Sequence, residues 1–358
     1  MKFGVLLADA PDEITSPSEW LSDCLEVTAT AAGSGFDSIA VGQHFVAHPK
    51  LYLQPIPLLA RLASETGPDV RLIVAILLLP ILPPVEAAEQ LATLDIICGG
   101  RLTVGIGAGY RDDEFRAFGV NIAERVKRQV EGLALMRQLW SGDTVNFSGK
   151  YFSVSGVRCG TLPLQRPGPP VWIAGSADGA VRRAARHADA WYGYTRADLD
   201  LIERQLLLYR ATLAESGRPY PTELPMRREV FVAPTRAEAW DRAEALMAPR
   251  IALNDQWGVS RDLPPQSTKP QSFADFARGR FIIGDPDECR REIERYRSRI
   301  GPVHMVIRLR WPGMSRHETL AALQLFGREV IAAFKPPAGP PAVQQTDASQ
   351  QTAPKEVH

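Results

Sequence analysis

The sequence predicts one α/β domain folded as a (β/α)8 barrel, and two observations carry this prediction. Short, continuous apolar runs alternate along the chain with longer segments of helical period. Strands that are apolar without interruption are typical of parallel sheets buried on both faces. The chain has 358 residues, and such a barrel needs roughly 250 residues. A doubly wound open sheet is the alternative architecture.

Eight apolar, β-branched-rich runs are expected to form the strands. Because helical segments separate them, they imply a parallel sheet with right-handed crossovers, and a closed barrel is the arrangement expected at this length. The expected strands are Phe3–Leu7, Ser38–Val41, Arg71–Leu77, Leu102–Ile106, Val171–Ala174, Ala190–Tyr192, Arg228–Val232 and Val303–Leu309.

The segments between these runs carry apolar stripes at steps of three and four residues, as in Ile122–Trp140, Leu199–Leu213 and Leu320–Val330. Such stripes are typical of helices that pack one face on a sheet and expose the other to water. Capping residues mark helix starts: Ser16 and Asp285 each precede a proline and, two residues after it, a glutamate.

Three segments fall outside this repeat. Thr144–Phe147 and Lys150–Val154 flank Ser148-Gly149 and predict a hairpin inserted before the fifth strand. Residues 255–278, after the seventh strand, are polar and proline-bearing, and we expect a lid there. Residues 336–358 are expected to be a disordered tail, which leaves 1–335 as a single barrel domain.

Composition narrows the functional classes. The 41 basic and 41 acidic residues leave no net charge, which gives no support for nucleic acid or a membrane surface as a partner. Four separated cysteines without a CxxC pair suit reduced thiols in the cytosol. The first ten residues read as a buried strand and not as a signal peptide, and the apolar run of residues 70–82 is too short to span a bilayer. We therefore expect a cytoplasmic enzyme.

Chemistry in such a barrel is expected where the strands end, at their carboxyl-terminal face. His44 follows the second strand and is the candidate for proton transfer, because imidazole titrates near neutral pH. A structural histidine, hydrogen-bonded at the strand end, is the alternative. His48 is a weaker candidate, since His-Pro often marks only a turn.

Glycines also gather at strand ends. Gly105, Gly107 and Gly109 do not match the GxGxxG spacing of a dinucleotide site, but they let a flat cofactor or a phosphate approach the backbone closely. The sequence has no HExxH motif, no cluster of carboxylates with metal-ligand spacing and no GxSxG after a strand, so we expect neither a metallohydrolase nor a serine hydrolase.

After the fifth strand, Ser176 is expected to be the N-cap of a helix over Ala177–His187. A helix start with free N–H groups and a hydroxyl can bind a phosphate. The alternative is an ordinary cap, and Asp178 in the first turn would repel an anion.

Several stretches together resemble the luciferase-like flavin monooxygenase family, in the same order and over roughly residues 2–334. They are GFDSIAVGQHF (35–45), LATLDIICGGRLTVGIGAGYRDDEFRAFGV (91–120), LWSGDTVNFSGKYFSV (139–154), PGPPVWIAGSADGAVRRAARHADAWYG (167–193) and FIIGDPDECRREIERY (281–296). The combination of motifs is far more specific than any one of them.

The resemblance implies a barrel that binds FMN, or the deazaflavin coenzyme F420, at the carboxyl-terminal face. It also implies a cis non-proline peptide near Ile76–Leu77 and a cofactor phosphate held after the fifth strand. The implied cofactor-binding residues are Ile76, Leu77, Gly107, Ala108, Gly109, Tyr110, Ala174, Gly175, Ser176 and Ala177.

The chain departs from the family pattern at two positions. His44 matches the family histidine, but Gln43 stands where an acidic residue is common, which weakens the deazaflavin reading. Ala108 stands where some FMN-binding relatives place a phosphate-binding arginine, so Arg111 or Arg310 would have to supply that charge. The catalytic candidates are His44, His48 and Gln43, and the substrate candidates are Arg111, Trp191, Arg310 and Trp311.

The function that the resemblance implies is a two-component flavin-dependent monooxygenase. Reduced FMN would come from a separate NAD(P)H:flavin reductase, and O2 would oxidise a small, partly hydrophobic organic substrate beneath the lid. The protein is expected to be a homodimer. The alternatives are an F420-dependent dehydrogenase or reductase, which moves a hydride, and a flavin-binding barrel without catalysis.

Overall fold

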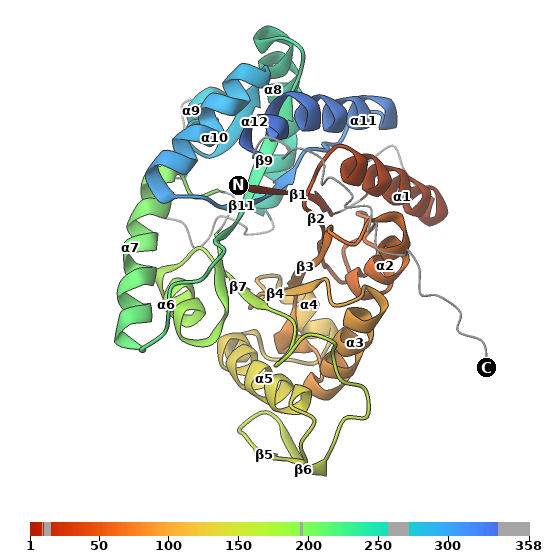
Figure 1. Ribbon diagram of the computed structural model, residues 1–358, viewed down its shortest axis with the longest axis vertical. Coiled ribbons are helices and arrows are strands. Elements are labelled where there is room, and N and C mark those ends of the chain that lie inside the picture. Colours follow the sequence, from red (N-terminus) through yellow and green to blue (C-terminus); the bar gives the residue numbers. More distant parts are fainter. Residues whose placement is uncertain (9, 11–15, 194–195, 257–271, 336–358) are drawn as a thin grey trace, which may run out of the picture.

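A curled parallel sheet, ringed by helices, forms the body of the protein (Figure 1). The computed structural model describes residues 1–8, 10, 16–193, 196–256 and 272–335. In this part of the chain the sheet has nine strands, in the order β10-β9-β11-β1-β2-β3-β4-β7-β8. Their bounds are β1 Lys2–Leu7, β2 Ser38–Val41, β3 Arg71–Leu77, β4 Leu102–Ile106, β7 Val171–Ala174, β8 Ala190–Tyr192, β9 Pro225–Val232, β10 Phe281–Gly284 and β11 His304–Arg308.

The helices cover the outer face of the sheet (Figure 1). Among them, α7 begins with Asp198 accepting a hydrogen bond from the Leu201 N–H, and α11 begins with a complete capping box between Ser315 and Glu318. The described helices are α1 Pro17–Gly33, α2 Pro55–Leu62, α3 Pro84–Ile97, α4 Asp112–Ala117, α5 Arg125–Trp140, α6 Asp178–His187, α7 Leu199–Glu215, α8 Arg236–Gln256, α9 Phe273–Ala277, α10 Pro286–Ile300, α11 Arg316–Leu325 and α12 Ala332–Phe334.

The two ends of the sheet meet beside β9. The N–H of Gly193 donates to the carbonyl of Pro225 at 3.0 Å, and the N–H of Arg227 donates to the carbonyl of Gly193 at 3.0 Å. These bonds form a parallel bridge between Gly193 and Met226, which links the end of β8 to the start of β9. The carboxyl ends of all these strands therefore face the same side of the molecule.

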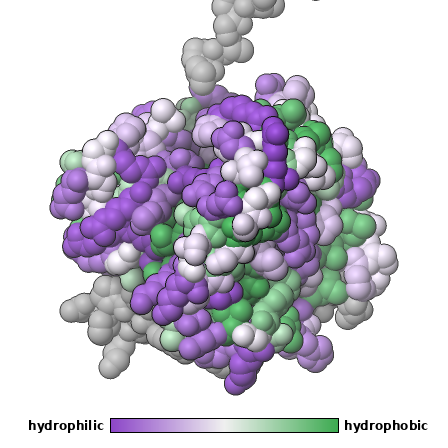
Figure 2. Space-filling model, turned by 90° about the horizontal axis from the view of Figure 1, so that it is seen from below, coloured by the Kyte–Doolittle hydropathy of each residue, from purple (hydrophilic) through white to green (hydrophobic). Residues whose placement is uncertain are grey.

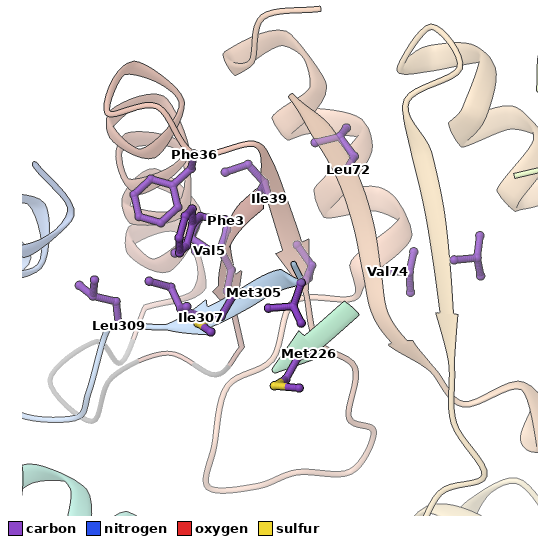
Figure 3. Close-up of a cluster of buried hydrophobic side chains, with 14 of the residues drawn as sticks. Phe3, Val5, Phe36, Ile39, Leu72, Val74, Met226, Met305, Ile307 and Leu309 are labelled. Atoms are coloured by element: carbon purple, nitrogen blue, oxygen red, sulfur yellow. The ribbon is translucent and has the colours of Figure 1, made fainter. Parts of the chain in front are cut away.

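Alternate residues of each strand face opposite sides of the sheet, as the period of two requires. On β1, Phe3 and Val5 belong to the core under the helices, whereas Leu6 belongs to a separate cluster with Trp172 and Val306 inside the curl. Figure 3 shows part of the outer cluster, in which Phe3 of β1 and Ile39 of β2 lie beside Phe36. The continuous apolar runs in the sequence thus reflect burial on both faces.

The structure shifts some bounds of the predicted strands by one to three residues and adds one strand. It adds β10, which pairs in parallel with Glu229–Val232 of β9, whereas the first half of β9 pairs with β11. The run of residues 281–284 stands directly before the capping residue Asp285, and the predicted strands do not include it.

A short antiparallel pair lies outside the curled sheet, next to α5 (Figure 1). Its strands are β5, Val145–Ser148, and β6, Ser153–Val157, one to three residues beyond the bounds predicted for the hairpin. Glu131 on α5 accepts hydrogen bonds from the backbone N–H groups of Lys150, Tyr151 and Phe152 and so ties the turn of the pair to that helix.

Two predicted segments fall largely outside the described residues. Residues 257–271 of the expected lid are among them, and the described remainder includes the end of α8 and the short helix α9. The expected tail, 336–358, is not described. No helix in the described ranges is long and apolar enough to cross a membrane, and Figure 2 shows hydrophobic and hydrophilic residues interspersed on one face.

Candidate active site

A cavity opens at the carboxyl-terminal ends of the strands. It encloses about 1050 Å³ with its open mouth included. Its lining combines small and apolar residues with a group of polar and charged ones. The lining residues are Leu6, Ala8, Gly42, Gln43, His44, Tyr52, Ala75, Ile76, Leu78, Gly109, Tyr110, Ala174, Tyr192, Gly193, Arg196, Arg227, Glu229, Arg250 and Arg308.

The ends of β3 and β4 form one wall of the cavity. The peptide bond between Ala75 and Ile76 is cis, one residue before the position that the family resemblance implied, and the pairing of β3 with β4 shifts register there. A Cβ atom on Gly107 would lie 1.9 Å from the Cδ1 atom of Ile76. Glycine at this position therefore lets the irregular end of β3 pack directly against β4.

His44, Glu114 and Tyr110 form a hydrogen-bonded row beside this wall. Nδ1 of His44 lies 2.8 Å from Oε1 of Glu114, which is fully buried, and Nε2 of His44 lies 3.4 Å from the Tyr110 hydroxyl. Burial, aided by the charge of Glu114, raises the pKa of Tyr110 to about 12, so the phenol keeps its proton at neutral pH. A carboxylate that accepts from Nδ1–H leaves Nε2 as the nitrogen that can exchange a proton with a ligand.

Arg111 and Glu114 also hold the loop that carries His44. Arg111 donates to the carbonyl oxygens of Phe45 at 3.0 Å and Val46 at 3.3 Å, and Glu114 accepts from the N–H of Phe45 at 2.9 Å. Val46 has a φ of 47°, which a β-branched residue rarely adopts. Arg111 thus lies behind the loop, and its described contacts are with the backbone and with Glu114.

The other two catalytic candidates lie in different surroundings. Gln43 lines the cavity, where its amide donates to Gln54 and accepts from the N–H of Leu78 at 2.8 Å. It therefore joins the end of β2 to the end of β3. His48 is exposed, precedes a cis proline and is not part of the described lining.

The loop after β7 differs in detail from its prediction. The N-cap of α6 is Ala177 and not Ser176, and the helix begins at Asp178. Ala174 lines the cavity, with Gly175 and Ser176 directly beyond it. The Ser176 carbonyl accepts a hydrogen bond from the Gln205 side chain on α7 at 2.6 Å, so this loop is tied to the neighbouring helix.

Asp178 does not present an unbalanced charge at the start of α6. Both of its carboxylate oxygens accept from Arg204 on α7, at 2.9 and 3.1 Å. The hydrogen bond from Arg204 lowers the pKa of Asp178. The repulsion that the sequence suggested for an anion at this helix start is therefore offset by an arginine from the neighbouring helix.

The remaining predicted residues pack around the cavity without being part of its described lining. Trp191 is buried and donates to the carbonyl of Gly175 at 3.0 Å, and Trp311 is buried and donates to the carbonyl of Val230 at 2.9 Å. Arg310 forms an ion pair with the buried Asp23 and lies over the ring of Trp20. Leu77 is fully buried in the core, and Ala108 stands between the glycines that follow β4.

The cavity also has a group of charged residues that was not predicted from the sequence. Arg227 and Glu229 stand on β9 and form an ion pair at 2.8 Å, and Arg196, Arg250 and Arg308 line the cavity beside them. A signal was present: Arg227 and Glu229 are two residues apart at the start of the run that was expected to form a strand. That spacing places both side chains on one face, here the inner one.

Comparison with known proteins identifies the family. The model of the luciferase-like monooxygenase family matches residues 1–301. The chain belongs to this family. It is thus an enzyme of the luciferase-like oxidoreductases, as the motifs in the sequence had predicted.

One curated relative of this luciferase-like protein matches part of the chain. The F420-dependent hydroxymycolic acid dehydrogenase of Mycobacterium tuberculosis is 34% identical over 166 residues, which span 46% of this chain and 44% of the relative. The chain thus matches less than half the length of that curated relative.

Solved structures share the fold over nearly the whole chain. Monooxygenase RslO1 of Streptomyces bottropensis has a TM-score of 0.78 at 24% identity, covering 94% of this chain and 100% of its own. The FMN complex of the oxygenating constituent of 3,6-diketocamphane monooxygenase from Pseudomonas putida has a TM-score of 0.78 at 19% identity, covering 92% and 98%. An F420-dependent secondary alcohol dehydrogenase has a TM-score of 0.74 at 20% identity, covering 92% and 98%. Members of this fold thus include proteins that use FMN and proteins that use F420.

Proposed function

We propose that the protein is a flavin-dependent monooxygenase that uses reduced FMN and O2 to oxidise a small organic substrate in a closed (β/α)8 barrel. The single observation that carries the proposal is the row of Glu114, His44 and Tyr110 at the edge of the cavity. The row puts a histidine that is hydrogen-bonded to a buried glutamate beside a cavity that opens to solvent at the ends of the strands.

The residues around the cavity fit a flavin. The cis peptide of Ala75 and the close approach at Gly107 leave a wall of backbone and small side chains, against which a flat ring can lie. The start of α6 offers backbone N–H groups for a phosphate, and Arg204 offsets the charge of Asp178 there. Gly175, Ser176 and Ala177 would hold the phosphate, and Ile76, Gly109 and Tyr110 would contact the ring.

The chain's own residues would manage protons and water. Reduced FMN, when bound, would supply the two electrons with which one oxygen atom enters the substrate and the other becomes water. His44 would give or take the proton at Nε2, and Glu114 would stabilise the imidazolium. The apolar lining from Leu6, Ala8 and Leu78 would keep water away. A separate NAD(P)H:flavin reductase would provide reduced FMN, and the protein would act as a homodimer.

A second candidate is an F420-dependent dehydrogenase. The observation that favours it is the 34% identity with the F420-dependent hydroxymycolic acid dehydrogenase. In that case His44 would exchange the proton of a substrate hydroxyl while a hydride moves to or from the deazaflavin, and no oxygen would be consumed.

Anaerobic titration with reduced FMN and, separately, with reduced F420 tests the choice between the two. The monooxygenase predicts tighter binding of reduced FMN and oxygen consumption coupled to substrate oxidation. Tighter binding of reduced F420, together with turnover in the absence of O2, would reject the monooxygenase and support the dehydrogenase. In either case His44→Ala is expected to lower turnover by about 100-fold or more, whereas His317→Ala, at an exposed histidine of α11, serves as the matched control. Unchanged turnover in His44→Ala would remove the proposed proton-transfer role.

A further inference from the structure

The lining of the cavity includes a second polar group, on β8 and β9. Tyr192, the last residue of β8, is 5% exposed, and its hydroxyl has no hydrogen-bond partner among the described residues. Glu229 on β9 is 6% exposed; Oε1 accepts from Arg227 at 2.8 Å, and Oε2 has no hydrogen-bond partner in the same part of the chain. Both residues line the cavity.

These two atoms have complementary hydrogen-bonding character. Burial raises the pKa of Tyr192; the charge of Arg227 opposes this and the charge of Glu229 adds to it. The phenol therefore remains protonated and can donate, whereas a carboxylate oxygen can only accept. Native proteins rarely leave buried polar atoms without a partner, and such atoms in a cavity are typical of a site that a ligand completes.

The surroundings fix both side chains. The Tyr192 ring packs on Trp172, with ring centroids 5.8 Å apart, and the ion pair with Arg227 holds the Glu229 carboxylate. Both side chains are therefore held by neighbouring groups before a ligand binds, which lowers the entropy cost of binding.

We propose that Tyr192 and Glu229 recognise a hydroxyl group of the substrate. The Tyr192 O–H donates to the hydroxyl oxygen, and the hydroxyl hydrogen donates to Oε2 of Glu229. A ketone satisfies Tyr192 alone and sets its oxygen against the carboxylate, and a hydrocarbon satisfies neither. The proposal rests on the proposed function, because it assigns a substrate class to the same cavity: an organic molecule with an apolar body and an alcohol group.

Binding of three matched probes tests this assignment: 1-(4-fluorophenyl)ethanol, 4′-fluoroacetophenone and 1-ethyl-4-fluorobenzene, which differ only at the benzylic carbon. Their dissociation constants are measured by 19F NMR on the protein with FMN present. The alcohol is expected to bind about 10-fold or more tightly than the hydrocarbon, since a buried polar site discriminates strongly against a ligand that leaves it unpaired.

Two variants separate the two hydrogen bonds. Tyr192→Phe should weaken the binding of the alcohol and of the ketone by roughly 10-fold each and leave the binding of the hydrocarbon unchanged. Glu229→Gln should weaken the binding of the alcohol relative to that of the ketone, because the amide N–H of glutamine can donate to a carbonyl oxygen. Tyr220→Phe, at an exposed tyrosine outside the cavity, is the control.

Three results would overturn the assignment: equal binding of all three probes to the wild type, as a bridging water would give; an unchanged preference in Tyr192→Phe; or an unchanged preference in Glu229→Gln. The dissociation constant of FMN, measured on each variant, reports separately on folding and on the proposed function. If the wild type does not bind FMN, the proposed function is rejected. If the wild type binds FMN but binds the three probes equally, only the hydroxyl site is rejected.

Discussion

Glu114 shows how one buried residue can control a reactive neighbour. It is fully buried, and its Oε1 atom accepts from both the His44 ring and the Phe45 backbone. A buried carboxylate that receives several hydrogen bonds fixes the orientation of its partners and stabilises a positive charge on the imidazole.

Glu114→Gln is therefore expected to lower the rate of turnover by about 10- to 100-fold, with little change in FMN affinity. The amide keeps the size of the side chain but removes the charge that would stabilise a protonated His44. Asp113→Asn, on the same helix but exposed and paired with Arg116, is the matched control. Steady-state kinetics of the two variants check this, and a Glu114→Gln enzyme with the turnover of the wild type would contradict it.

The site residues show where a sequence is informative and where it is not. His44 and Tyr110 were predicted because they follow strands, and both line the cavity. Arg111, Arg310 and Trp311 also follow strands, and Trp191 lies within β8, but none of the four is part of the described lining. The direction of a side chain after a strand depends on the loop conformation, which the strand period does not determine.

The helix α6 and its neighbour α7 illustrate an interaction at the scale of elements. Asp178 occupies the first turn of α6, where the helix dipole and the free N–H groups favour an anion. Arg204 on α7 pairs with it through two hydrogen bonds. The neighbouring helix therefore determines whether the start of α6 attracts or repels a phosphate.

Arg204→Gln is expected to weaken the binding of FMN by roughly threefold, because the pair is about half exposed and such pairs contribute little each. Riboflavin, which lacks the phosphate, should bind as before. Asp178→Asn in the same protein should restore FMN binding. Arg210→Gln, elsewhere on α7, is the control, and an equal loss for FMN and riboflavin would show that the start of α6 does not hold the phosphate.

Element types were easier to predict than element boundaries. Eight of the nine sheet strands coincide with predicted runs because apolar continuity is a strong signal. The run at β10 stands directly before the cap of α10, and α6 begins at Asp178 and not at the predicted Ala177. Such details depend on tertiary contacts, here the bond from Gln205 to the Ser176 carbonyl.

At the scale of the whole molecule, the interior of the curled sheet is layered. The cavity lies at the carboxyl ends of the strands, and Trp172 lies below it, inside the curl. The Trp172 ring meets the His304 ring edge-on, with ring centroids 5.6 Å apart. Ser38 lies 2.7 Å from Nε2 of His304, and Glu223 lies 3.1 Å from Nδ1. The amino ends of the strands are thus closed by a polar network remote from the cavity.

Glu223 is the centre of this network, because it also pairs with Lys2 at 3.1 Å and with Arg71. The network joins the starts of β1, β3 and β11, which are far apart in the sequence. Burial raises the pKa of Glu223, but the hydrogen bond to His304 and the positive charges of Arg71 and Lys2 together hold it well below its usual value.

Glu223→Gln should lower the free energy of unfolding at pH 7 by about 2–3 kcal/mol. The folded pKa of Glu223 lies below its unfolded value near 4.5, so its stabilisation is complete above that pH and declines as the pH falls further. The difference between wild type and variant in urea unfolding should therefore narrow between pH 5 and pH 3. Glu215→Gln, at the exposed end of α7, should show no such difference. If the difference in unfolding free energy between wild type and variant stays constant or widens in acid, the charge of Glu223 does not stabilise the fold.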